Sequence, residues 1–113
     1  MKKAVLAILL AGVLLLSFGC RSSKWENGTF YGTGTGHGGP IKAEVVIEKG
    51  KITKVEAVEH KETPGIGDAA ITKISTDVVK AQKAEVDAVS GATRTSEGFI
   101  EAIANALSEA EKK

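Results

Sequence analysis

The segment in which residue types and spacing could do chemistry is 87–93, with the sequence DAVSGAT. Its last residue, Thr93, offers a hydroxyl, which is the nucleophile that a phosphoester bond to a protein requires. Gly91 and Ala92 add almost no side chain beside it, so the active site of a second protein could approach the backbone closely. By residue type alone, the Thr93 hydroxyl is therefore a candidate nucleophile in an accessible segment.

Two further hydroxyls follow, and they reach the start of a predicted helix. Thr93, Thr95 and Ser96 sit just ahead of that helix, where free backbone N–H groups and the positive end of the dipole favour the charge of a phosphodiester. Ser and Thr at such places are also common helix N-caps. This segment alone leaves both interpretations open.

A second loop, 62–67 (ETPGIG), could contact a planar ring. Pro64 fixes its own φ, whereas Gly65 and Gly67 permit a turn that lies flat and directs N–H groups at ring oxygens and nitrogens. A plain loop between a strand and a helix is the alternative. His37 and His60 have no carboxylate or cysteine partner at ligand spacing, so neither is given a role, and no catalytic residue or metal site is predicted.

The N-terminus has the layout of a secretory leader: Lys2 and Lys3, then an uncharged apolar run ending at Gly19 and Cys20. The run is shorter than the roughly 18 to 20 residues that span a membrane. A small residue before a lone cysteine resembles the lipobox of bacterial lipoproteins, although Ser17 replaces the usual Leu. We expect a signal peptide over 1–19, then lipidated Cys20 with a tether to residue 28. An ordinary signal peptide with a leftover thiol is the alternative.

Composition allows one small domain. The chain has 113 residues, and removing the 19 of the leader leaves 94. Fifteen basic and 14 acidic residues become 13 and 14 once Lys2 and Lys3 leave, so no basic excess suggests nucleic-acid binding. One cysteine excludes an internal disulfide framework.

Residues 29–40 contain five glycines among twelve residues and include the letters of the dinucleotide fingerprint G-x-G-x-x-G. That fingerprint needs a following helix, whereas 41–48 alternates with the period of a strand, so a dinucleotide fold is not expected. A tight turn at 49–51 leads into a second strand at 52–59, with a bulge possible between Ile52 and Val55. The expected order is strand, strand, strand, helix (about 71–81), short strand (87–93) and helix (about 96–110). This is an α+β domain over 29–113, with a small antiparallel sheet built on a hairpin and packed with two helices.

The segment 87–93 resembles the flavinylation motif D-x-x-[S/T]-G-A-[T/S] of the FMN-binding domain family, which includes flavin-carrying subunits of sodium-pumping and Rnf-type complexes. In that family a flavin transferase, using FAD and magnesium, joins FMN to the last hydroxyl by a phosphoester. The resemblance implies covalent FMN on Thr93. The rest of the motif is Asp87, Ser90, Gly91 and Ala92, and Asp87 is implied to be part of what the transferase recognises.

The resemblance extends over the glycine-rich opening, the hairpin and the loop 62–67, in family order. Because the family places this loop near the isoalloxazine, the implied flavin contacts are Thr63, Pro64, Gly65, Ile66 and Gly67.

These features predict an electron-transfer flavoprotein, lipid-anchored on the extracytoplasmic face of a bacterial cell membrane, rather than an enzyme with its own substrate. Its implied partners are the flavin transferase, a membrane electron donor, a downstream acceptor and, through Cys20, the membrane. A noncovalent FMN module for sensing, storage or delivery is the alternative. A third possibility is a structural lipoprotein without flavin.

Overall fold

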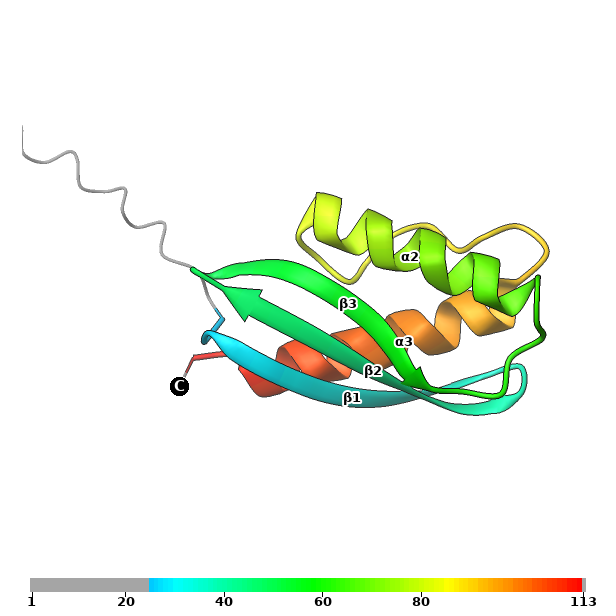
Figure 1. Ribbon diagram of the computed structural model, residues 1–113, viewed down its shortest axis with the longest axis horizontal. Helices are drawn as coiled ribbons and strands as arrows, with labels where there is room; N and C mark the ends of the chain where they lie inside the picture. The colour runs from blue at the N-terminus through cyan, green and yellow to red at the C-terminus, as the bar shows by residue number, and fades with distance from the viewer. Residues whose placement is uncertain (1–24, 113) are drawn as a thin grey trace, which may run out of the picture.

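The computed structural model describes residues 25–112, so the expected signal peptide, Cys20 and most of the tether lie outside the described residues. One antiparallel sheet in the order β1-β2-β3 carries two helices on one face (Figure 1). The elements are β1 (Gly28–Gly36), β2 (Gly39–Glu48), β3 (Lys51–Glu59), α2 (Gly67–Ala81) and α3 (Thr93–Ala110). The predicted α+β class is confirmed. Within 25–112, no helix combines the length and hydropathy needed to cross a membrane.

The hairpin between β2 and β3 has the expected turn and the expected bulge. Lys49 and Gly50 both have positive φ, 54° and 77°, as a two-residue type I′ turn requires. Val46 pairs with Lys54 and Ile47 with Ile52, which leaves Thr53 as an extra residue. The bulge explains how Ile52 and Val55, three residues apart, are both buried.

The glycines of β1 let α3 lie directly on the strand. A Cβ on Gly32 would come within 2.1 Å of the Ala102 carbonyl oxygen, and one on Gly34 within 2.1 Å of the Gly98 carbonyl oxygen. A Cβ on Gly98 would in turn lie 2.5 Å from the Thr35 carbonyl oxygen. The alternating glycines therefore form a strand whose inner face fits a helix backbone, and no dinucleotide loop is present there.

The core lies between the sheet and the helices, as the periodicity predicts. The sheet contributes the inward residues of β2 together with Ile52 and Val55, and each helix contributes one stripe. Ala81, predicted to share the α2 stripe, is exposed, and Ile100 on α3 is half-buried. The buried members predicted from helical spacing are Ile71, Ile74, Val78, Phe99, Ile103 and Leu107.

The predicted short strand over 87–93 is wrong. Both helices begin at the same end of the domain, so the chain must return along α2 before α3 can start (Figure 1). It does so as an extended loop without strand pairing. Gln82, at φ 59°, ends α2, and its side-chain amide bonds to the N–H and C=O of Ile52, both at 2.9 Å. The β3 edge is thus bonded by a side chain where a further strand could pair.

Both helices begin earlier than the sequence predicts. α2 starts at Gly67 instead of about 71, and α3 at Thr93 instead of about 96. Glycine and threonine have low helix propensity, which hid these first turns in the sequence pattern. The hydroxyls expected ahead of the last helix therefore belong to its first turn.

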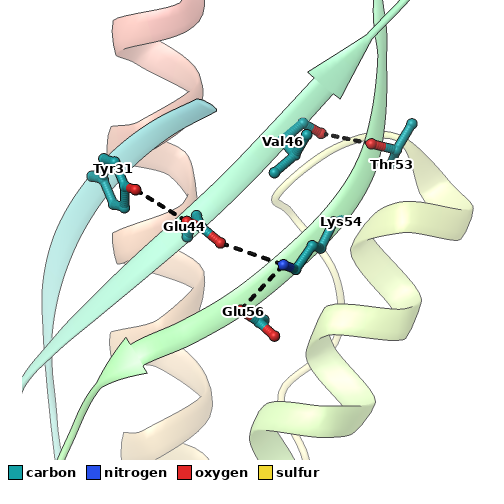
Figure 2. Close-up of polar contacts among 6 residues, drawn as sticks. All are labelled: Tyr31, Glu44, Val46, Thr53, Lys54 and Glu56. Carbon is teal, nitrogen blue, oxygen red and sulfur yellow. Dashed lines mark hydrogen bonds and ion pairs between the residues drawn. The ribbon is translucent and has the colours of Figure 1, made fainter. Parts of the chain in front are cut away.

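The other face of the sheet is polar. The Tyr31 hydroxyl donates to Glu44 at 3.0 Å, and Figure 2 shows Lys54 between Glu44 (3.7 Å) and Glu56 (3.5 Å). Lys54 and Glu56 are more than half exposed, so these ion pairs contribute little to stability. An antiparallel sheet with one solvated face needs no second layer.

Replacing Gly34 by Val tests the contact between β1 and α3. Because the new side chain would meet helix backbone, which cannot rotate away, we expect a loss of about 3 kcal/mol or more in the free energy of unfolding. Thr33→Val, on the exposed side of the same strand, is the matched control and should change stability little. Urea unfolding measures both. Equal midpoints for the two variants would contradict the close packing.

Candidate functional site

A cavity of about 460 Å³ lies at the end of the domain where both helices begin. It is formed by the β1–β2 turn, the segment after β3 and the first turn of α3. Cofactor sites typically enclose about 300 to 1,000 Å³. The two loops singled out in the sequence therefore meet at one site. Its lining residues are His37, Thr63, Ile66, Gly67, Gly91, Ala92, Thr93, Arg94 and Thr95.

Two turns of the same kind lead into the helices. In the first, the Ile66 N–H donates to the Thr63 carbonyl at 3.2 Å, with Gly65 at φ 84° in the third position. In the second, the Ala92 N–H donates to the Val89 carbonyl at 3.0 Å, with Gly91 at φ 87°. In a type II turn the third residue has a positive φ and the second does not, and the positive φ favours glycine at the third position. These glycines are thus needed for backbone shape.

Both helix N-termini border the cavity without a side-chain cap. The residues before the first helical positions are Ile66 for α2 and Ala92 for α3, and within residues 25–112 neither of them makes a side-chain capping bond. The first N–H groups of a helix have no partner inside it, and the dipole adds partial positive charge there. With Arg94 on the wall, this end suits an anionic group such as a phosphate.

The three hydroxyls of the first α3 turn have different surroundings. Ser96 accepts from the Val89 N–H at 2.9 Å and donates to the Ala92 carbonyl at 2.8 Å, so it holds the preceding turn. Thr95 is buried and donates to Glu62. Thr93 is exposed, lines the cavity and makes no side-chain hydrogen bond within residues 25–112. Of these three hydroxyls, only that of Thr93 is available for chemistry.

Glu62 is a buried carboxylate, 5% exposed, that joins three elements around the cavity. It accepts the N–H groups of His37 at 2.9 Å and Gly38 at 2.8 Å, both in the β1–β2 turn, and the Thr95 hydroxyl from α3. Burial raises the pKa of Glu62, but the bonds from Thr95, Gly38 and His37 outweigh it, so this pKa lies below its ordinary value. The carboxylate therefore stays charged and fixes the cavity walls.

Not all of the predicted site residues line the cavity. Thr63, Ile66 and Gly67 do, together with Gly91, Ala92 and Thr93 from the motif. Pro64, Gly65 and Ser90 belong to the two turns and do not line it. Asp87 lies along a separate groove beside the end of α2, is exposed, and has no hydrogen bond or ion pair within 25–112.

Sequence reasoning missed three residues of the site. His37 was given no role, yet it lines the cavity, and Arg94 does so beside Thr93. The sequence places Glu62 only in the loop 62–67 and indicates no role for it. No local pattern identifies these residues, because the β1–β2 turn and α3 come together only in the folded chain. His60 lies outside the cavity lining, where its Nδ1 accepts the Glu62 N–H at 3.1 Å.

Fold and site together define a small cofactor-binding module with a cavity suited to a phosphate and a flat group. The model of the FMN-binding domain matches residues 36–108. The chain therefore belongs to the FMN-binding domain family. The match contains the two loops, His37, Glu62 and all of the α3 first turn.

The chain is similar to parts of three longer proteins. An uncharacterized protein of Treponema pallidum is 33% identical over 78% of this chain and 24% of its own length. A urocanate reductase of Eggerthella lenta is 37% identical over 67% of this chain and 12% of its own length. An NADH:acrylate oxidoreductase of Vibrio harveyi is 29% identical over 74% of this chain and 8% of its own length. The chain thus spans less than a quarter of each relative.

The cavity fits FMN by its chemistry. The helix N-termini and Arg94 suit the phosphate, and the loop with Ile66 and Gly67 offers an apolar and backbone surface to a ring. Within residues 25–112, no group of His, Cys, Asp and Glu could hold a metal ion.

Replacing Glu62 by Gln tests its role in holding the cavity. At neutral pH we expect a loss of about 2 kcal/mol of stability, because three donors lose a charged acceptor. The folded pKa lies below the ordinary 4.5, so the stabilisation is complete above about pH 4.5 and is lost as pH falls through the folded pKa. The stability curves of wild type and variant should therefore converge in acid.

Glu59→Gln, at the exposed end of β3, is the control, since this carboxylate makes no bond within the described chain. Urea unfolding at several pH values measures all three proteins. If the free energy of unfolding of the wild type exceeded that of Glu62→Gln by the same amount down to the lowest pH, a charged, hydrogen-bonded Glu62 would be contradicted.

Proposed function

We propose that Thr93 carries FMN through a phosphoester and that the domain relays electrons. The observation that carries this is Thr93, the first residue of α3, which is exposed on the cavity wall and whose hydroxyl makes no hydrogen bond to any residue in 25–112. In the reaction a flavin transferase uses FAD and magnesium. The Thr93 oxygen bonds to the phosphorus of the FMN half, the pyrophosphate bond breaks, AMP leaves and the hydroxyl proton passes to a base of the transferase.

This chain's residues would bind and orient the cofactor. The N–H groups at the start of α3 and the Arg94 guanidinium would stabilise the remaining phosphodiester charge. The loop with Thr63, Ile66 and Gly67 would contact the ring. When bound, the flavin supplies uptake and release of up to two electrons with their protons.

The relatives support a redox role. Two of them are named as a urocanate reductase and an NADH:acrylate oxidoreductase, and this chain matches only 12% and 8% of their lengths. That is the pattern of a module that supplies a cofactor within larger redox proteins. Here the donor would be a membrane oxidoreductase and the acceptor a downstream redox centre.

The proposed location is the extracytoplasmic face of a bacterial membrane, with Cys20 as the lipid anchor. The support is the charged and apolar leader ending at Gly19 and Cys20. Each buried methylene contributes about 0.8 kcal/mol, so two or three acyl chains hold a protein firmly.

A noncovalent FMN module is the second candidate. The cavity of about 460 Å³, with its backbone donors, could hold FMN without a bond to Thr93. The two candidates differ in whether the flavin survives denaturation.

Replacing Thr93 by Val tests the covalent bond. From cells that also make a flavin transferase, the wild-type protein should keep its flavin absorbance in urea and gain the mass of one FMN less water. Thr93→Val lacks the oxygen nucleophile and should lose both signals. Thr29→Val, exposed at the start of β1, is the matched control and should keep both. Flavin that washes out of the wild type in urea would favour the noncovalent module.

Replacing Cys20 by Ala tests the anchor. The wild-type protein should sediment with membranes and be released by detergent, because its acyl chains are buried in the bilayer. Cys20→Ala removes the thiol that accepts the lipid and should move the protein to the soluble fraction. Fractionation followed by immunoblotting measures this. A variant that still sediments with membranes would count against lipidation at Cys20.

A further inference from the structure

The described chain enters the domain at the end opposite the cavity. The Glu26 N–H donates to the Ala110 carbonyl at 2.7 Å, and Trp25 forms a β-bridge with Glu111. Trp25 is only 7% exposed, so this residue already belongs to the packed domain. Both contacts are made at the C-terminal end of α3, whereas the cavity is at its N-terminal end.

Helix α3 gives the separation of the two ends. It has 18 residues, and at 1.5 Å per residue it spans about 25 Å from Thr93 to Ala110. The β2–β3 turn lies at the Trp25 end, because the Gly50 N–H donates to Asn27 Oδ1 at 2.8 Å. Figure 1 shows the same polarity, with the start of β1 and the end of α3 at one end and the starts of both helices at the other.

The segment between the anchor and the domain is short. Cys20 precedes Trp25 by five residues, which reach at most about 17 Å when fully extended. Turning the domain over, so that the cavity faced the bilayer, would lift Trp25 about 25 Å above the surface. A tether of this length cannot allow that orientation.

We propose that the anchored domain holds the cavity away from the bilayer, so that it exchanges electrons with protein-borne centres exposed to the aqueous phase, that of its membrane donor included, and not with a quinone dissolved in the membrane. This rests on the proposed function, through the anchor at Cys20 and FMN at Thr93. Electron tunnelling falls steeply with distance, so a partner must reach the cavity end itself. Ile66, 58% exposed and on the cavity wall, offers an apolar contact for a small, transient redox interface.

A matched pair of dye positions tests the orientation. Lys51→Cys and Lys61→Cys replace exposed lysines at the first position of β3 and two residues after its end, and β3 itself spans about 26 Å. Cys20 is the one natural cysteine and is consumed by the lipid, so each variant has one free thiol for a donor dye. The lipidated full chain is placed on vesicles whose headgroups carry an energy-transfer acceptor.

Energy transfer from position 51 should greatly exceed that from position 61. Equal transfer from the two positions, or greater transfer from 61, would overturn the orientation, as would protein that does not float with the vesicles. The dyes do not depend on the flavin. A chain that lacks covalent FMN but shows the expected difference would refute the proposed attachment and leave the orientation standing.

The partner class is tested with the reduced holo-protein on vesicles, without oxygen. A water-soluble ferric haem protein should reoxidise the flavin equally fast whether the domain is anchored or made soluble by Cys20→Ala. Two ferric haems take up the two electrons of one reduced flavin, and two protons are released. A long-chain quinone in the bilayer should give no faster reoxidation than vesicles without it. Rapid oxidation by the bilayer quinone would overturn the proposal.

Discussion

The direct contact between the backbones of β1 and α3 is the constraint on which the rest of the structure depends. Glycines at alternate positions of β1 leave no side chain between the strand and the helix. On the helix, Gly98 likewise has no side chain to separate it from the backbone of β1. The apolar residues of β2 and β3 can then reach α3 and α2 in one shared core. Because this contact fixes α3 lengthwise on the sheet, it also fixes where the first turn of α3, with Thr93, lies.

Glu62 converts that arrangement into a shaped site. Its carboxylate holds the β1–β2 turn through two backbone N–H groups and holds α3 through Thr95. A Cβ on Gly67 would lie 2.5 Å from the Glu62 Cβ, so the start of α2 packs against the same residue. One buried charge thus ties together the β1–β2 turn, α3 and the start of α2, and the bonds it accepts lower its pKa.

The polarity of the domain follows from its connections. α2 and α3 point the same way, which requires the long return loop 82–92 and places two uncapped N-termini at one end. Thr93, Arg94 and the loop with Thr63, Ile66 and Gly67 lie together there, while the described chain enters at the other end through Trp25. An attachment at the Trp25 end, such as the proposed lipid anchor, would leave the cavity end accessible.

The sequence by itself determined the fold class, the hairpin with its bulge, the buried stripes of the helices and the family, because alternation, helical spacing and the segment DAVSGAT are local patterns. It wrongly predicted a strand at 87–93, since an extended segment looks the same whether or not it has a partner. Only the tertiary structure showed that His37, Glu62 and Arg94 belong to the site, and that Thr93 has the free hydroxyl while Thr95 and Ser96 are bonded. These facts depend on contacts between residues far apart in the chain, and no local spacing encodes them.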